Sequence, residues 1–166
     1  MLSRLKRFNM LLLFPAVLLL AYVTVSCRNV RRDYYPNGNL RSEIQVSGDQ
    51  YDGQARFFYQ DGTLQMECTY ADDKLEGRLV RYYESGNRKE LLYYRDNKSD
   101  SIYRFWDQGG NLLVACSYRD SILDGPFSEF YENGQLKTSG HYHEGLFDGL
   151  WLFYDRQGKL TGVKRY

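Results

Sequence analysis

The sequence predicts an all-β protein, an elongated single-layer antiparallel meander of about 5.5 hairpin repeats. Three observations predict it: glycines recur every 24 residues, apolar and polar residues alternate over short segments, and turn dipeptides separate those segments. A fixed period of about 20 to 50 residues is typical of repeat proteins, in which each unit packs mainly on its neighbours. The first glycine column is Gly38, Gly62, Gly86, Gly110, Gly134 and Gly158.

The first 26 residues differ from the rest and are expected to form a signal peptide. Arg4, Lys6 and Arg7 precede an apolar run over residues 11–25. This run has about 15 residues, fewer than the roughly 20 that cross a bilayer as a helix. A basic segment before a short apolar one is typical of a cleaved export signal. The alternative is a membrane anchor that stays attached.

The leader ends at Thr24-Val25-Ser26-Cys27, which resembles a bacterial lipobox. The resemblance implies that Cys27 is acylated and becomes the mature N-terminus, with residues 27–32 as a short tether. Two or more acyl chains anchor a protein stably, because each buried methylene contributes about 0.8 kcal/mol. The expected location is the bacterial cell envelope, lipid-anchored to a membrane after cleavage of residues 1–26.

The charge balance argues against one class of partner. The chain has 22 Lys+Arg and 21 Asp+Glu, a formal net charge of +1. Loss of the leader removes three cations and no acid, which leaves 19 against 21 and a net charge of −2. No remaining basic block is longer than Arg31-Arg32. Nucleic-acid binding needs a basic patch that neutralises phosphates, so no nucleic acid is expected as a partner.

Residues 33–166 are expected to form one repeat domain, in which each repeat has two strand-like halves. In the first half, Leu64, Met66, Cys68 and Tyr70 alternate with polar residues, as in a half-buried strand. The second half, such as residues 125–131, is rich in aromatic residues. These residues suit a pleated surface.

Turn chemistry separates the halves. Asn37-Gly38, Asp61-Gly62 and Asn133-Gly134 predict two-residue hairpin turns, which need the positive φ that glycine adopts easily. Trp106 and Tyr154 stand one residue early in their repeats, which predicts a bulge or longer loop after each of them. The remaining turns are polar and suited to exposed loops: Asp72-Asp73, Asp96-Asn97, Asp120-Ser121 and Glu144-Gly145.

This pattern resembles the MORN repeat family. The resemblance rests on residues 59–64 with Glu76-Gly77, and on residues 130–136 with Asp148-Gly149. More narrowly it is similar to the bacterial YwqK-type variant, whose members are commonly labelled antitoxins. It covers residues 33–166 and is weakest in the third repeat, where Arg88 replaces a leucine and Ser101 a glycine. The resemblance implies an elongated, curved sheet used for binding or scaffolding.

Cys68 and Cys116 invite a disulfide, but the repeat argues against it. They hold the same position two repeats apart. Two repeats are four strands, so their Cα atoms should lie about 19 Å apart, beyond the limit of about 7 Å for a disulfide. Both are expected to be free cysteines on the apolar face of the sheet.

Two further groups could suggest a metal site. His141 and His143 share one strand face, yet no third ligand stands at a suitable spacing, so solvated surface is the better interpretation. The acidic column should repeat every two strands, about 10 Å, too far to share one ion; turn chemistry explains it. Its members are Asp52, Glu76, Asp100, Asp124 and Asp148. No metal, cofactor or catalytic residue is expected, and the glycines are explained by turns, so the protein is not expected to be an enzyme.

The aromatic residues are the strongest candidates for a binding surface. The chain has 16 Tyr, 9 Phe and 2 Trp, more than a small closed core would use. In a single-layer sheet some rings must stay accessible, and exposed aromatic stripes mark binding surfaces. The alternative is that they only cover one another. The candidate partner-contact residues are Tyr70, Tyr94, Tyr118, Tyr142, Trp106 and Trp151.

These observations together predict a membrane-anchored bacterial lipoprotein whose repeat sheet is a non-catalytic protein-binding or scaffold module. The YwqK resemblance implies an antitoxin- or immunity-like form, with a toxin as the partner. One alternative is a carbohydrate- or cell-wall-binding repeat protein, in which ring faces stack on the ligand. Another is a purely structural envelope protein. The two open edges of a meander also permit a homodimer by edge-strand pairing.

Overall fold

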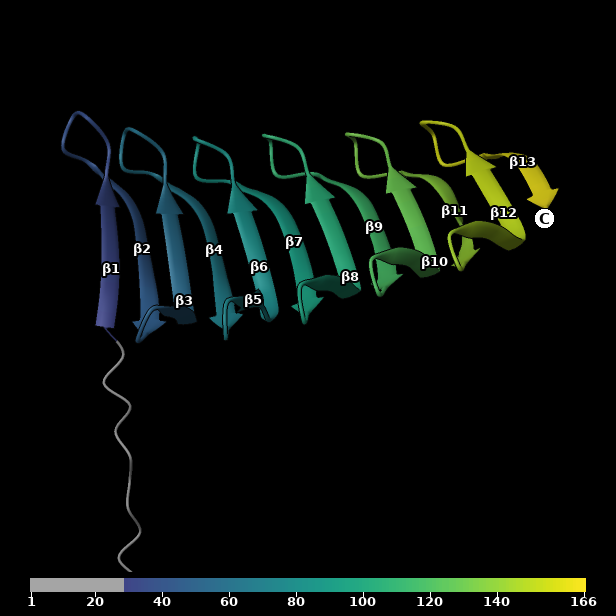
Figure 1. The fold of residues 1–166 in the computed structure, drawn as a ribbon. Coiled ribbons are helices and arrows are strands. Elements are labelled where there is room, and N and C mark those ends of the chain that lie inside the picture. The colour runs from purple at the N-terminus through teal and green to yellow at the C-terminus, as the bar shows by residue number, and fades with distance from the viewer. Residues whose placement is uncertain (1–28) are drawn as a thin grey trace, which may run out of the picture.

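A computed structural model describes residues 29–166, which form one open antiparallel sheet of 13 strands without a helix (Figure 1). The predicted all-β, single-layer meander is confirmed. The strands lie side by side in chain order, except that β5 pairs only with β4. Their bounds are β1 Asn29–Tyr34, β2 Leu40–Ser47, β3 Gln50–Phe58, β4 Leu64–Ala71, β5 Lys74–Leu75, β6 Gly77–Tyr82, β7 Arg88–Arg95, β8 Lys98–Trp106, β9 Leu112–Arg119, β10 Ile122–Phe130, β11 Leu136–His143, β12 Leu146–Tyr154 and β13 Leu160–Arg165.

The expected signal peptide, residues 1–26, and Cys27 lie outside the described residues. In the described part, no helix is long and apolar enough to cross a membrane. The sheet begins at Asn29, inside the expected tether of residues 27–32. Asn29 pairs with Val46 and Asp33 with Ser42 in regular antiparallel register. The tether prediction was wrong for residues 29–32, because their backbone hydrogen-bonds to β2.

The Asx-Gly loops are longer than predicted. Between β3 and β4, the Tyr59 amide donates to the carbonyl of Thr63 at 2.8 Å and the Gly62 amide donates to Tyr59 at 3.0 Å. Asp61 supports the loop by accepting a hydrogen bond from the Thr63 amide at 2.8 Å. Gly62 has φ 93°, which needs glycine, but it ends a β-turn within a five-residue loop. The two-residue prediction was therefore wrong at this end of the hairpins.

Tight two-residue turns lie at the opposite end. Asp72 and Asp73 have φ 48° and 65°, and they join Ala71 to its partner Lys74. Positive φ at both central residues is the type I′ geometry that matches strand twist. Asp, Asn and Ser adopt it here where glycine would be expected, at Asp96-Asn97 and Asp120-Ser121 as well.

The expected irregularity after Trp106 is absent. Trp106 pairs with Leu112 and Phe58 pairs with Leu64, with the same register shift before each pair. The loop also has the same hydrogen bonds, from the Asp107 amide to Asn111 and from the Gly110 amide to Asp107. The predicted slip was therefore wrong. Trp106 is at the position of the first aromatic residue of the pair, and Asp107 is at the position of the second.

That second aromatic residue links successive repeats. The Tyr59 hydroxyl donates to the carbonyl of Tyr82 at 2.8 Å, one repeat onward. The equivalent hydroxyls of Tyr35, Tyr83 and Tyr131 make the same bond to residues 58, 106 and 154, at 2.7 to 2.9 Å. Asp107 instead binds Asn111 within its own loop, at 2.9 and 3.0 Å. Among residues 29–166, this seam between adjacent loops therefore has no tyrosine link.

The second glycine column forms bulges inside strands. On β8, Tyr103 pairs with Leu92 and Ser99 with Tyr94, so residues 100–102 lie opposite the single residue 93 of β7. Gly53 and Gly125 adopt φ 117° and 114° at the equivalent points of β3 and β10. Ser101 holds the same column with φ 76°, a conformation that is costly for a residue with a Cβ. The acidic residue before each bulge therefore precedes a strand irregularity, not the turn that the sequence suggested.

We expect Ser101→Gly to stabilise the protein by about 1 kcal/mol, because glycine adopts the bulge conformation without the Cβ penalty. The measurement is the free energy of unfolding in urea. Ser99→Gly is the matched control, because Ser99 lies on the same strand and is not among the positive-φ residues. It should be neutral or destabilising. A loss of stability in Ser101→Gly would contradict the bulge assignment.

Candidate functional site

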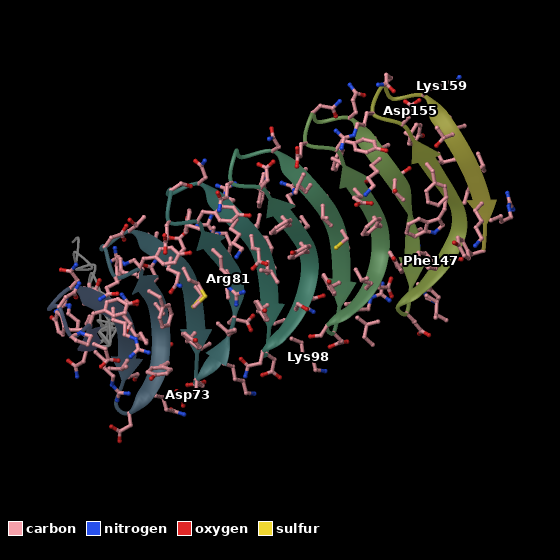
Figure 2. All side chains as sticks on the ribbon, turned by 90° about the horizontal axis from the view of Figure 1, so that it is seen from above. Asp73, Arg81, Lys98, Phe147, Asp155 and Lys159 are labelled. Carbon is pink, nitrogen blue, oxygen red and sulfur yellow. The ribbon has the colours of Figure 1, made fainter. Side chains whose placement is uncertain are left out.

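One face of the sheet collects the apolar side chains. The register places Ile44, Ala55, Cys68 and Leu79 in one row across β2 to β6, and these four are buried. Aromatic rings flank this row, and no second layer covers them in residues 29–166. We call this the aromatic face, and Figure 2 shows its side chains on the bowed strands. Its rings include Tyr51, Tyr70, Tyr94, Tyr103, Tyr118, Phe127, Tyr142, Phe147, Trp151 and Tyr166.

The four candidate tyrosines form one line along this face. Tyr70, Tyr94, Tyr118 and Tyr142 are all half-buried. Neighbouring rings orient them: Tyr51 lies 5.5 Å from Tyr70 between centroids. Burial raises the pKa of Tyr70 to about 12, so its hydroxyl stays protonated at neutral pH. The line therefore offers neutral, oriented rings with part of each surface open to a partner.

The two candidate tryptophans have different surroundings. Trp151 is only 2% exposed, lies between Tyr142 and Phe147, and donates its indole N–H to the carbonyl of His141 at 3.2 Å. It supports the rings around it and offers little surface of its own. Trp106 is half-buried at the end of β8, where the Arg88 guanidinium lies 5.3 Å from its ring centroid. The structure therefore places Trp151 with Tyr142 and keeps Trp106 apart from the tyrosine line.

Two shallow grooves lie at equivalent positions of the repeat. The first has a volume of about 340 Å³ and the second about 290 Å³. The second is the first moved by 48 residues, which is two repeats or about 19 Å along the sheet. Phe57, Met66, Arg81 and Lys89 in the first correspond to Phe105, Val114, Glu129 and Lys137 in the second. The apolar residues are similar in the two grooves. The charge differs at one position, where the first groove has Arg81 and the second has Glu129.

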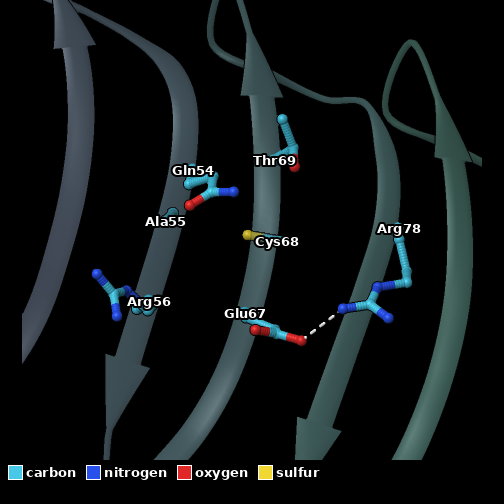
Figure 3. Close-up of a pocket in the computed structure, with 7 residues that line it drawn as sticks. All are labelled: Gln54, Ala55, Arg56, Glu67, Cys68, Thr69 and Arg78. Atoms are coloured by element: carbon cyan, nitrogen blue, oxygen red, sulfur yellow. Dashed lines mark hydrogen bonds and ion pairs between the residues drawn. The ribbon is translucent and has the colours of Figure 1, made fainter. Parts of the chain in front are cut away.

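The opposite face is charged, and sequence reasoning missed it. Glu43 bridges Arg32 at 2.6 Å and Arg56 at 3.1 Å. Next to this trio, Glu67 pairs with Arg78 at 2.8 Å across a groove, which Figure 3 shows in close-up. These residues belong to different strands and are 11 to 13 apart in sequence, so only cross-strand register brings them together. Opposite charges at alternate strand positions were the available signal.

The cysteine prediction is confirmed. Cys68 and Cys116 are free and buried. Burial raises the pKa of each thiol to about 11. The thiolate, which is the nucleophile, is therefore scarce at neutral pH, so the structure gives neither cysteine a reactive character.

The histidines and acids make local pairs. His141 and His143 are exposed, with His141 Nδ1 3.6 Å from Asp148 and His143 Nδ1 3.9 Å from Asp124. Asp124 also pairs with Arg119 at 3.4 Å. Within residues 29–166, no group of three or more His, Cys, Asp or Glu side chains could hold a metal ion. Partners within the same or the next hairpin thus account for these charges.

Comparison with known families agrees with this geometry. The family described as MORN repeat variant matches residues 29–46, 51–72, 75–96 and 123–144, which together make up slightly more than half of the chain. The matched segments follow the hairpin repeats of the sheet. No curated protein matches the chain.

We expect Gly140→Ala to destabilise the protein by about 1–3 kcal/mol, because overpacking forces the surrounding side chains to shift. A Cβ at Gly140 would lie closer than 3.0 Å to the Trp151 ring. Thermal unfolding and near-ultraviolet circular dichroism report the stability and the packing of the rings. Gly162→Ala is the matched control, because its Cβ would meet Phe153 at an ordinary 3.5 Å. Equal behaviour of the two variants would contradict the supporting role of Trp151.

Proposed function

This chain belongs to the MORN repeat variant family, and from that premise we propose that it is a bacterial envelope lipoprotein whose sheet binds another protein. MORN repeats point to a repeat-based protein-binding or structural module, and the family is generally non-catalytic. The observation that carries the proposal is the aromatic face: a line of half-buried tyrosines lies on a single-layer sheet with no second layer over residues 29–166. Half-exposed aromatic rings are typical of interface cores.

The shape of the surface favours a macromolecular partner. Twelve strands lie side by side, because β5 is off this path, and at about 4.8 Å between neighbours they give a sheet roughly 50 Å long. Its two equivalent grooves lie about 19 Å apart and are shallow, whereas small-molecule sites usually enclose most of the ligand. A partner that spans both grooves would meet Arg81 in one and Glu129 in the other. This difference in charge would favour one orientation of the partner along the sheet over the reverse.

The anchor completes the proposal. Cys27 lies two residues before Asn29, the first residue of β1. Two residues span at most about 7 Å, so an acylated Cys27 would hold β1 close to the membrane. Because the strands follow in chain order, β13 would then be the most distant strand. The aromatic face would extend away from the bilayer, open to proteins in the envelope.

An immunity-like role is the specific form that we propose. The sequence resembles YwqK-type proteins, and an antitoxin that works by covering its partner needs only an extended binding surface. A carbohydrate-binding role has less support. Stacking on sugar rings needs open ring faces, yet Trp151 is buried and a guanidinium lies near the ring of Trp106.

We expect intact-mass spectrometry of the membrane-extracted protein to find a chain that begins at Cys27 and carries added acyl mass. Cys27→Ala should lose that mass, because the variant has no thiol at residue 27 to acylate. An unprocessed chain of 166 residues in the wild type would refute the lipoprotein proposal.

We expect Tyr94→Lys to lower recovery of a co-purified partner from native membrane extracts at least tenfold, because a buried charge at an interface core is costly. Tyr93→Lys is the matched control. The Tyr93 side chain neighbours Tyr94 in sequence but lies on the charged face, so this variant should retain the partner. Thermal unfolding of both variants checks that each is folded. Equal recovery with the two variants would refute the aromatic face as the binding surface.

A further inference from the structure

Exposed apolar side chains gather at the end of the sheet formed by β12 and β13. Leu146 is 73% exposed, Val163 56% and Phe147 47%. Of the eleven large hydrophobic residues that are exposed in residues 29–166, six fall in the last 21 positions. Phe147 and Tyr166 are on the aromatic face, whereas Val163 is on the opposite face. Exposed apolar surface on both faces favours an interaction at this end of the sheet. The six are Leu146, Phe147, Leu150, Leu160, Val163 and Tyr166.

The same end presents an open strand edge. β13 pairs with β12 on one side, and no strand of residues 29–166 lies on its other side. An open edge has unpaired backbone N–H and C=O groups, which can hydrogen-bond to an added strand. Tyr166 prolongs the aromatic face to this edge, with its ring stacked 4.7 Å from Phe147.

The charge of this edge is positive. Arg156, Lys159, Lys164 and Arg165 lie within the last eleven residues, against one acid in the last twelve, Asp155. No salt bridge is formed by these four cations among the described residues. A strand that pairs here should therefore carry acidic residues, because opposite charges across strands are favourable and like charges are not.

The repeat phase argues against a second copy as the occupant. Lys164 stands where earlier repeats place Ile44, Cys68 and Leu92, and it faces the same side, with its Nζ 4.3 Å from the Tyr166 ring centroid. The strand that continues the repeat would place the equivalent of Ala55 opposite Lys164. In a second copy that residue on β1 is Arg31, which lies on the aromatic face over Tyr51 at 5.5 Å. Head-to-tail stacking would therefore set two cations directly opposite each other.

We propose that the β13 edge binds an acidic strand with alternating apolar side chains from a partner protein, which adds to the sheet as the next strand. This inference rests on the proposed protein-binding function but assigns it a second surface, separate from the tyrosine line. Backbone pairing supplies affinity, the apolar side chains on the aromatic face cover Tyr166, and the carboxylates select against another copy of this chain.

The chain contains a template for such a strand. The β10 sequence, residues 122–130, has two acids and no Lys or Arg. In its own place it pairs with β9, where Phe127 lies opposite Cys116 and Glu129 opposite Val114. The same register on β13 would place Phe127 opposite Lys164 and Glu129 opposite Gly162, diagonal to the Lys164 ammonium. Phe127 also stands at the repeat position of Arg31, so one substitution converts the template into a mimic of β1.

The experiment is a titration of the full chain with a synthetic peptide of residues 122–130, followed by backbone amide chemical shifts. The peptide with Phe127→Arg is the matched control. We expect shifts concentrated on β13, and binding of the control about five- to tenfold weaker. Binding should weaken further in 0.5 M salt, since screening reduces the attraction between exposed charges.

Lys164→Glu tests the charge assignment in the protein itself. It should reverse the preference, so that the Phe127→Arg peptide binds better than the original. The new glutamate should also pair with Arg31 of another copy and produce concentration-dependent association in sedimentation. The double variant Lys164→Glu, Arg31→Glu should not associate. Wild type should remain unassociated at the same concentrations.

Four results would overturn the inference: no binding of the β10 peptide, shifts centred on β1, equal binding of both peptides by both proteins, or head-to-tail association of the wild type. A failed peptide titration together with partner capture that depends on Tyr94 would refute the edge and leave the proposed function intact. Binding of the peptide at β13, together with partner capture that does not depend on Tyr94, would refute the aromatic face as the binding surface and retain the edge.

Discussion

The sheet depends on contacts between adjacent strands, because it has a single layer. A sandwich or barrel closes its core with a second sheet, but here each strand is stabilised only by the two strands beside it. Every strand pair must therefore contribute both backbone hydrogen bonds and side-chain packing. The row from Ile44 through Ala55, Cys68 and Leu79 shows the result, since each member is buried only between its neighbours. The 24-residue period repeats this contact along the chain.

This constraint also explains the two faces. One face carries rings large enough to cover one another across a distance of one strand, as Tyr142 and Phe147 do at 5.1 Å. The other carries long ionic side chains that reach across strands, as Arg32, Glu43 and Arg56 do. Exposed ion pairs contribute little stability, typically below about 1 kcal/mol. The aromatic face therefore holds the sheet together, and it is the face with surface left for a partner.

The period, the alternation and the aromatic residues predicted the architecture and the buried, free state of Cys68 and Cys116. They could not predict which end of a hairpin has the tight turn. Asx-Gly at residues 61–62 is the stronger sequence signal, yet the two-residue turn forms at Asp72-Asp73, because cross-strand pairing fixes the loop length and aspartate tolerates positive φ. Charged pairs such as Glu67 with Arg78, and the burial of Trp151, depend on register and on Gly140, which a single repeat unit does not reveal.

The strand order has a mechanical consequence. Neighbours in sequence are neighbours in the sheet, so the long axis of the sheet lies perpendicular to the strands (Figure 1). A pulling force applied between the first and last strands would act perpendicular to the strands. It would break the hydrogen bonds of a strand pair one after another and so peel the pair apart, whereas a force parallel to the strands would load them together. The tyrosine hydroxyls that link successive loops would resist this peeling. The same force would act on every strand pair. The seam at Asp107 lacks the tyrosine link, so tension would separate the sheet there into two shorter ribbons.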